Sequence, residues 1–207
     1  MNLKGKTAIV TGGNSGIGLS IVLELAKQGA NIVIDYVVHP ETAEDLEKQV
    51  LALGDKAITV KADVSKVADL QSLVDAAVKN FGRLDILVNN AGGGVILPFL
   101  EQTPESLRLT IDRNLWTVIW CCRAALPVMR KQQYGRIVNM GADSVRSGLY
   151  AHAAYNAAKG GVHAIGSGLA REFVHDGITV NAIAPCAVNT PQLVELVKNN
   201  EALLKKF

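Results

Sequence analysis

A tyrosine and a lysine in the carboxyl-terminal half of the chain are the residues best suited to acid–base chemistry. Tyr155 and Lys159 stand four residues apart in the segment Tyr155-Asn156-Ala157-Ala158-Lys159. On a helix this spacing brings both side chains to one face, so the phenol and the ammonium can share a site. A nearby cation can lower the pKa of a tyrosine by roughly 1 to 3 units, and such a phenol can act as a general acid or base. Alone, the same spacing is common on solvated helix faces.

A glycine-rich segment near the amino terminus is a second candidate site. The first expected strand runs directly into Gly12-Gly13-Asn14-Ser15-Gly16-Ile17-Gly18, and a helix is expected to begin near Gly16. The backbone N–H groups and the dipole at such a helix start favour a pyrophosphate, which glycines allow the backbone to approach closely. No Gly-Lys-Ser/Thr follows, which disfavours a P-loop nucleotidase. A turn needed only to pack the helix on the strand stays the alternative.

The end of the second expected strand bears on the choice of cofactor. Asp35 and Tyr36 lie about 20 residues beyond the glycines, where a dinucleotide-binding fold meets the adenosine ribose. No Arg or Lys follows Asp35 closely enough to bind a 2′-phosphate, and the Asp35 carboxylate would repel one. The sequence therefore leans toward NAD over NADP.

Six β-branched segments, alternating with amphipathic stretches, must position these residues. The expected strands cover residues 7–11, 32–36, 57–60, 86–88, 136–140 and 178–183. A glycine that is typical of a helix end precedes each later strand, at Gly29, Gly54, Gly82, Gly135 and Gly177. This alternation predicts a single α/β domain over residues 1–207, a Rossmann-like doubly wound parallel sheet with helices covering both faces. The chemistry should then lie in loops at the carboxyl ends of the strands.

The composition excludes several other classes of protein. The 207 residues carry 21 Lys plus Arg against 19 Asp plus Glu, without the basic block that duplex nucleic acid requires. The longest apolar helical run, residues 115–122, is far shorter than the roughly 20 residues of a membrane span, and the amino end has no signal-peptide core. We therefore expect a cytoplasmic protein with no nucleic-acid or membrane partner. Cys121, Cys122 and Cys186 suit buried reduced thiols better than a disulfide framework or a metal site.

Five motifs, in order, closely resemble the short-chain dehydrogenase/reductase family over essentially the whole chain. They are residues 11–18, Asp63-Val64, residues 89–92, Asn114 and the pair Tyr155 and Lys159. The resemblance implies hydride transfer between the nicotinamide of NAD or NADP and a small alcohol or ketone. It also implies that Tyr155 exchanges the hydroxyl proton, while Lys159 holds the nicotinamide ribose and lowers the tyrosine pKa. Asn114 would hold a water in a proton relay to the lysine, although an amide bonded to a helix carbonyl stays the alternative.

The glycine segment and the resemblance together give a set of expected cofactor contacts. Asp63 would bond the adenine edge, or else cap the helix that opens near Ser65. The family's ribose-binding acid aligns with Tyr36 rather than Asp35. The expected contacts are Gly12, Asn14, Ser15, Gly16, Ile17, Gly18, Asp35, Tyr36, Asp63, Val64, Asn89, Ala91, Gly92, Tyr155, Lys159, Val188 and Thr190.

The chain departs from the family pattern at several places. Where the family has a serine that bonds the substrate oxygen, this chain has Ala142, and losing such a donor outright costs about 100- to 1,000-fold in rate. Ser144 is the nearest hydroxyl, so it is either the catalytic stand-in or a plain turn residue. Cys186 stands where the family often has glycine. The chain also ends at Phe207, before the helix and edge strand that the resemblance would add.

The expected substrate pocket is mostly apolar, which favours a weakly polar alcohol or ketone. Residues 120–127 resemble ring cis-diol dehydrogenases of the family, residues 142–146 resemble cyclic-alcohol dehydrogenases, and the first 80 residues resemble glucose 1-dehydrogenases. A cyclic alcohol, a diol or a sugar is therefore the expected substrate. A non-catalytic dinucleotide sensor or a truncated inactive homologue is the alternative, because of Ala142 and the short carboxyl end. By resemblance, the helices expected at 103–131 and 153–175 pair across a twofold axis in a homodimer or homotetramer.

Overall fold

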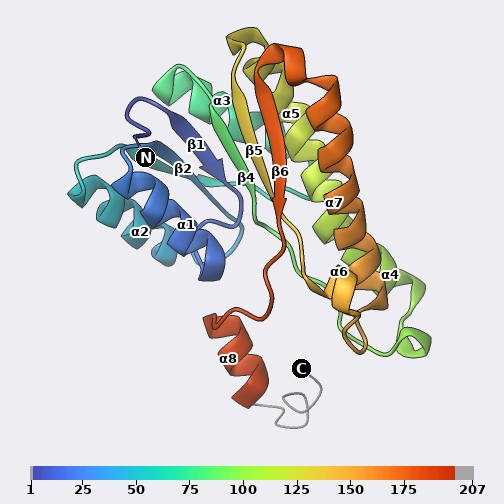
Figure 1. The fold of residues 1–207 in the computed structure, drawn as a ribbon. Helices are drawn as coiled ribbons and strands as arrows, with labels where there is room; N and C mark the ends of the chain where they lie inside the picture. Colours follow the sequence, from blue (N-terminus) through green and yellow to red (C-terminus); the bar gives the residue numbers. More distant parts are fainter. Residues whose placement is uncertain (1, 199–207) are drawn as a thin grey trace.

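The computed structural model describes residues 2–198, which form one six-stranded parallel sheet flanked by helices (Figure 1). Its strand order is β3-β2-β1-β4-β5-β6. The strands are β1 (Thr7–Val10), β2 (Asn31–Tyr36), β3 (Ala57–Lys61), β4 (Ile86–Asn89), β5 (Gly135–Met140) and β6 (Ile178–Ile183). All six expected strands are confirmed to within one residue at either end. The order reverses between β1 and β4, and ligands bind at such a switch point in open α/β sheets.

The helices connect the strands in the expected alternation. They are α1 (Gly16–Lys27), α2 (Pro40–Ala52), α3 (Val67–Phe81), α4 (Pro104–Ile111), α5 (Thr117–Gln132), α6 (Ser144–Ser147), α7 (Ala153–Glu172) and α8 (Pro191–Lys198). The carboxyl ends of the strands point toward α4, α6 and α8 (Figure 1). The loops that could carry chemistry therefore gather at this edge of the sheet.

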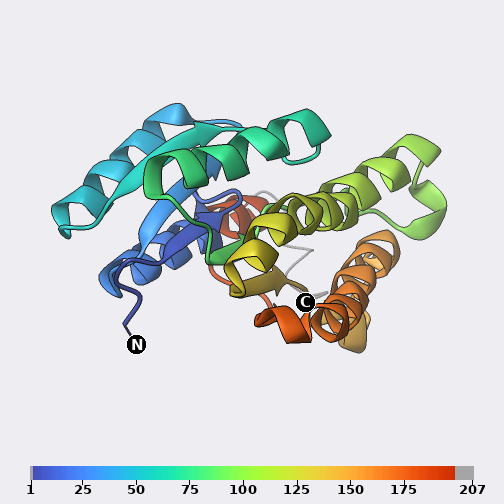
Figure 2. The ribbon, with the colours of Figure 1, turned by 90° about the horizontal axis from the view of Figure 1, so that it is seen from above.

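The view from above shows helices on either side of the sheet (Figure 2), and a hydrophobic core lies between the sheet and each of these helix layers. One joins the sheet to α3, α5 and α7, and the other joins β1, β2 and β4 to α1 and α2. Helices cover both faces of the sheet as expected, while Thr179, Asn181 and Ile183 of the edge strand β6 are exposed. Among the described residues, the helix pair α1 and α2 packs near β1 to β3 and does not extend across β6.

The helix expected over residues 103–131 is interrupted. Thr103 begins it with a capping box to Ser106, but a π-helical turn, Asp112–Trp116, separates α4 from α5. This turn contains Asn114, and π-helical turns are frequent at functional sites. Gly135 does not end α5, since Gln133 adopts the left-handed conformation there and Gly135 begins β5.

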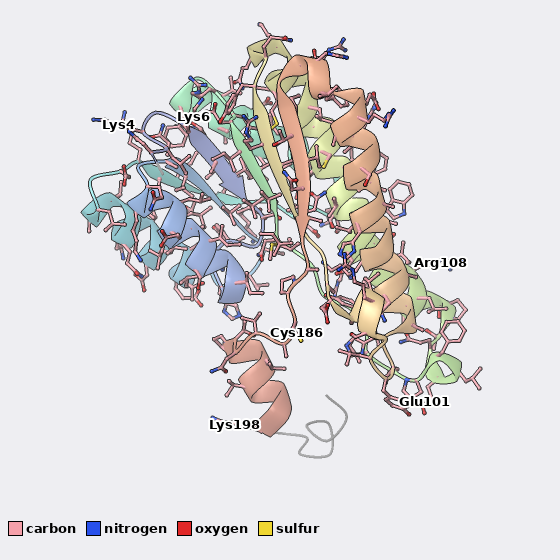
Figure 3. The ribbon with its side chains drawn as sticks, in the orientation of Figure 1. Lys4, Lys6, Glu101, Arg108, Cys186 and Lys198 are labelled. Atoms are coloured by element: carbon pink, nitrogen blue, oxygen red, sulfur yellow. The ribbon has the colours of Figure 1, made fainter. Side chains whose placement is uncertain are left out.

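The three cysteines do not share one environment. Cys121 and Cys122 are buried as expected, and burial raises the pKa of Cys122 to about 12. Cys186 is exposed, so the expectation of a buried thiol is wrong there. It lies on the irregular segment that leads from β6 to α8 (Figure 3). Within residues 2–198, no helix combines the length and apolarity needed to cross a membrane.

Candidate active site

The turn between β1 and α1 has a backbone shape that its glycines make possible. Gly12 and Gly16 have φ of 57° and 52°, a region that L side chains rarely adopt. A Cβ on Gly18 would collide with the Gly12 carbonyl oxygen, so α1 packs directly on the turn. No side-chain oxygen of Ser15 caps α1, which leaves the first N–H groups of the helix available to an anion.

Asp35 lies beneath this turn rather than on its open side. The residue is fully buried, and its Oδ2 accepts a hydrogen bond from the Gly12 N–H at 3.0 Å. Its backbone oxygen accepts a second from the Gly13 N–H at 2.8 Å. Burial raises the pKa of Asp35 to about 7. The expected contact with the adenosine ribose is therefore wrong for Asp35, because this side chain lies inside the protein beneath the glycine turn.

Asn14 and Asn89, two of the expected cofactor contacts, form hydrogen bonds between neighbouring elements of the fold. The amide of Asn14 donates to the Val38 carbonyl at 2.8 Å and the Thr42 hydroxyl at 3.0 Å, which ties the glycine turn to the start of α2. Asn89 is buried at the end of β4, and its amide donates to Asn139 Oδ1 of β5 at 2.8 Å. Asn89 therefore joins β4 to β5 beneath the expected cofactor site and does not line the cavity there.

A cavity of about 1040 Å³ opens at the switch point between β1 and β4. Ten of the expected cofactor residues line it, namely Gly12, Asn14, Ser15, Gly16, Ile17, Asp63, Val64, Ala91, Gly92 and Thr190. Gly18 packs behind the turn and Val188 is exposed beside Thr190, while Tyr36 is partly buried at the end of β2. The glycine cradle, the uncapped helix start and the size of the cavity fit an elongated dinucleotide.

Asp63 presents an ionised carboxylate at one end of this cavity. Its Oδ1 accepts from the Ser65 hydroxyl at 2.6 Å and the Ser65 N–H at 3.1 Å. These hydrogen bonds, led by that from the hydroxyl, lower the pKa of Asp63. Because α3 begins only at Val67, Asp63 closes the turn before the helix instead of capping it, and its carboxylate still faces the cavity.

Tyr155, Lys159 and Asn114 converge on the glycine segment after β4. A Cβ built on Gly92 would lie 2.8 Å from Asn114 Oδ1 and 3.4 Å from Lys159 Nζ, so both groups lie beside that glycine. A Cβ on Gly94 would lie 3.3 Å from the Tyr155 ring. The π-helical turn and α7 thus deliver the three expected catalytic side chains to one place.

Asn114 is held by backbone on both sides. Its amide nitrogen donates to the Gly93 and Thr110 carbonyls, each at 2.8 Å, and its Oδ1 accepts from the Gly93 N–H at 3.2 Å. The Asn114 amide is therefore bonded to a helix carbonyl, as the alternative expected, and it also bonds the glycine segment after β4. These bonds fix the amide beside Lys159.

Burial shifts the pKa of both members of the Tyr155–Lys159 pair. It lowers the pKa of Lys159 to about 8 and raises that of Tyr155. Lys159 Nζ donates to the Met140 carbonyl at 2.7 Å and lies 5.7 Å from the centre of the tyrosine ring. The expectation that the lysine lowers the tyrosine pKa is not met in this structure, because desolvation outweighs attraction at that separation.

Ser144 is engaged elsewhere than in the expected substrate contact. It is buried, and its hydroxyl donates to Asn156 Oδ1 at 2.6 Å, which ties α6 to α7. That geometry supports the alternative of a structural turn residue. Ala142 itself is buried, with its backbone N–H directed to His163 Nε2 at 3.3 Å.

Two tryptophans line the cavity that the sequence did not single out as cofactor contacts. Trp116 and Trp120 stack at 5.1 Å between ring centroids, and both line the same cavity as Asp63. Their spacing of four residues, which places both rings on one face of a helix, was the available signal.

The chain belongs to the short-chain dehydrogenase family, since the family model described as short chain dehydrogenase matches residues 6–201. It is an oxidoreductase that transfers hydride between the nicotinamide of NAD(P) and the carbon of an alcohol or ketone.

Curated relatives extend this result. The chain is 51% identical, over 99% of its length and 79% of the relative's, to the 2,3-dihydroxy-2,3-dihydro-p-cumate dehydrogenase of Pseudomonas putida. It is 36% identical to the 1,6-dihydroxycyclohexa-2,4-diene-1-carboxylate dehydrogenase of Acinetobacter baylyi, over 90% of this chain and 70% of that one. A crystal structure from Sinorhizobium meliloti 1021, of a protein assigned as a short-chain alcohol dehydrogenase, superposes with a TM-score of 0.91 at 30% identity, covering 99% of this chain and 81% of that one.

Proposed function

We propose that this dehydrogenase oxidises a ring-borne cis-diol with NAD⁺. The observation that carries the proposal is the convergence of Tyr155, Lys159 and Asn114 on the segment Gly92–Gly94. The ring-diol names of the two dehydrogenase relatives favour this substrate class. The loop after β4 adds the exposed apolar side chains of Ile96 and Leu97, which suit a weakly polar ring.

Each of the three side chains has a defined task in this proposal. Tyr155 accepts the proton of the substrate hydroxyl as hydride leaves the carbon, and returns it in the reverse direction. Lys159, whose pKa lies near 8, exchanges protons readily near neutral pH and can pass one on from the tyrosine. Asn114 would orient a water molecule that links the Lys159 ammonium to bulk solvent. Ala142 supplies no hydroxyl, so the substrate oxygen is positioned without a serine there.

The cavity residues would hold the cofactor, which supplies the hydride acceptor at its nicotinamide. The N–H groups at the start of α1 would bind its pyrophosphate, which the glycine turn allows to approach closely, and Asp63 and Val64 would bind its adenine. Val37 and Val38 line the cavity where a 2′-phosphate would need a cation, and this favours NAD over NADP. Val188 and Thr190 would contact the nicotinamide end.

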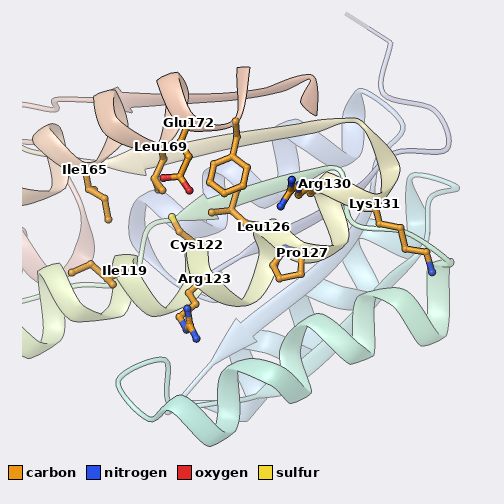
Figure 4. Close-up of a pocket in the computed structure, with 11 residues that line it drawn as sticks. Ile119, Cys122, Arg123, Leu126, Pro127, Arg130, Lys131, Ile165, Leu169 and Glu172 are labelled. Atoms are coloured by element: carbon orange, nitrogen blue, oxygen red, sulfur yellow. The ribbon is translucent and has the colours of Figure 1, made fainter. Parts of the chain in front are cut away.

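A homodimer or homotetramer is also part of the proposal. Apolar side chains of α5 and α7 line a hollow of about 620 Å³ (Figure 4). Ile119 and Leu126 come from α5, and Ile165 and Leu169 from α7. A twofold axis through this face would bring the same helices of a second copy against it. The cytoplasmic location expected from the sequence stays a prediction.

The test is a substrate panel assayed by the appearance of NADH or NADPH. It contains a cyclohexadiene cis-diol, the matching trans-diol, cyclohexanol, glucose and a 3-hydroxyacyl thioester, each with NAD⁺ and with NADP⁺. We expect the highest kcat/KM for the cis-diol with NAD⁺. Turnover of the thioester alone, or of the cis-diol only with NADP⁺, would contradict the substrate or the cofactor assignment respectively.

A further inference from the structure

Helix α7 contacts the carboxyl end of β5 through two side chains that lie one helical turn apart. Lys159 donates to the Met140 carbonyl at 2.7 Å, and His163 Nε2 accepts from the Ala142 N–H at 3.3 Å. Only the lysine has a part in the proton transfer derived above. The histidine instead holds the backbone at the position where the family has its substrate-binding serine.

The space for this imidazole is built into the turn. A Cβ on Gly141 would collide with the His163 ring, so glycine at this position is what allows the ring to reach the backbone. On the other side, the Gly141 N–H donates to the Ile183 carbonyl at 2.7 Å and the Asp143 N–H to the Pro185 carbonyl at 3.0 Å. The turn is therefore held by β6 and its following segment on one side and by His163 on the other.

The hydrogen bond requires a neutral imidazole with its proton on Nδ1, since Nε2 is the acceptor. Burial lowers the pKa of His163, and the positive charges of Arg146 on α6 and Lys159 on α7 lower it further. Residues 139–142 and Ile183 pack on the other sides and carry no ionisable side chain. Protonation would abolish the acceptor and add a second cation one turn from Lys159.

We propose that His163 is a positioning residue of the active site, whose neutral imidazole fixes the turn at Ala142 relative to Tyr155 and Lys159. The inference rests on the proposed function only in assigning the chemistry to that pair. With no serine hydroxyl at position 142, the substrate is placed by the shape of this turn, so a turn released from His163 lowers turnover. A displacement of about 1 Å can cost roughly 100-fold in rate.

The first readout needs no substrate. In the full chain, amide hydrogen exchange at Ala142 is measured for the wild type, His163→Gln, which keeps an acceptor without titrating, and His163→Ala, which removes it. We expect protection at Ala142 to survive in His163→Gln and to fall at least tenfold in His163→Ala. His175→Gln, an exposed histidine beyond the end of α7, is the matched control and should leave Ala142 unchanged. Equal protection in wild type and His163→Ala would overturn the proposal.

The second readout is the pH profile of kcat with a cyclohexadiene cis-diol and NAD⁺. We expect the wild type to lose kcat on the acid side through both the Tyr155–Lys159 pair and His163, and His163→Gln to lose it through the pair alone, with a shallower acid limb. His163→Ala should have a kcat about 10- to 100-fold lower above the pH at which His163 protonates. An acid limb of the same slope and midpoint in the wild type and in His163→Gln would overturn the proposal. If His163→Ala does not fold, the NMR titration of the His163 ring, assigned by its absence in His163→Gln, decides, and an ordinary or raised pKa overturns the proposal.

These readouts separate the two proposals. A wild type that oxidises no diol would defeat the proposed function, while the exchange of the Ala142 amide would still decide whether His163 holds the turn.

Discussion

Asp35 shows how a buried carboxyl group can shape a loop by holding its backbone N–H groups. Its carboxyl group and its backbone oxygen hold the N–H groups of Gly12 and Gly13, so these two donors are taken up within the protein. The pyrophosphate-binding donors must then come from the start of α1. Strand β2 is a continuous apolar run, buried on both faces, and such a run has no polar alternation to reveal which way Asp35 points.

The stability of the protein should depend on pH through Asp35. In the unfolded chain this carboxyl loses its proton near the ordinary value of 3.8, whereas in the folded protein burial raises the pKa to about 7. The folded state is therefore favoured most at low pH, and this contribution is lost as the pH rises from about 4 to 7. Asp35→Asn does not titrate. We therefore expect its free energy of unfolding, relative to that of the wild type, to be about 1–3 kcal/mol higher at pH 8 than at pH 5.

Urea unfolding of both proteins at the two pH values measures this difference, because other titrating groups cancel between them. A difference in the free energy of unfolding that stays constant with pH would show that Asp35 ionises as readily in the folded state as in the unfolded one.

The spacing of Tyr155 and Lys159 and the position of Asn114 could be read from the sequence, because short local motifs set them. The hydroxyl of Ser144 could not be placed in advance, since its partner Asn156 belongs to another helix and depends on how α6 packs against α7. Likewise, the direction of a pKa shift follows from burial, which the order of residues alone does not give.

At the scale of elements, Asp85 joins the amino ends of three strands on the side opposite the active site. Its buried carboxylate accepts from the Thr7 N–H at 2.9 Å and from Arg83 through two bonds of 2.6 Å, and it pairs with Lys6 at 3.2 Å. Its own carbonyl accepts from the Arg136 N–H at 2.8 Å. Burial would raise the pKa of Asp85, but the hydrogen bonds from Arg83, Thr7 and Lys6 outweigh it and hold the pKa below its ordinary value.

Removing this carboxylate should destabilise the sheet. We expect Asp85→Ala to lower the free energy of unfolding by about 2–4 kcal/mol, because the Thr7 N–H and two cations lose their partner. Asp45→Ala, which breaks the exposed pair with Lys48, is the control and should change nothing measurable. Denaturant unfolding at neutral pH compares them, and equal effects of the two substitutions would refute the role given to Asp85.

The interruption between α4 and α5 is an element that sequence periodicity missed. Apolar residues continue through 103–131 with helical spacing, and a single π-helical turn shifts that spacing too little to register. The start of this helix was expected at Thr103, in contrast, and Thr103 is indeed its N-cap with Pro104 as the first helical residue, which is a local signal.

At the scale of the whole molecule, the strand count and the parallel sheet follow from the alternation of β-branched and amphipathic segments. Which helix packs on which strand could not be read from the sequence, because it depends on sheet twist and packing. The packing of α7 beside α5 forms the face with the hollow that we propose as the contact between subunits (Figure 4).

This face should control the oligomeric state. We expect Leu169→Glu to shift the sedimentation coefficient from that of a dimer or tetramer toward that of a smaller species, because a carboxylate must lose its water when this face is covered. Val78→Glu, on the exposed side of α3, is the matched control and should leave the assembly unchanged. A wild type that sediments as a monomer, or an assembly indifferent to Leu169→Glu, would contradict this assignment.

The central claim is that Tyr155 carries out proton transfer in the oxidation of a ring cis-diol, and a comparison of the wild type with Tyr155→Phe tests it most directly. NADH formation is measured from NAD⁺ and a cyclohexadiene cis-diol, with NADH binding followed by fluorescence in the same preparations. We predict that the substitution lowers kcat by about 100- to 10,000-fold and leaves the affinity for NADH within a factor of about two. A Tyr155→Phe protein that turns over the diol at the wild-type rate would contradict the claim.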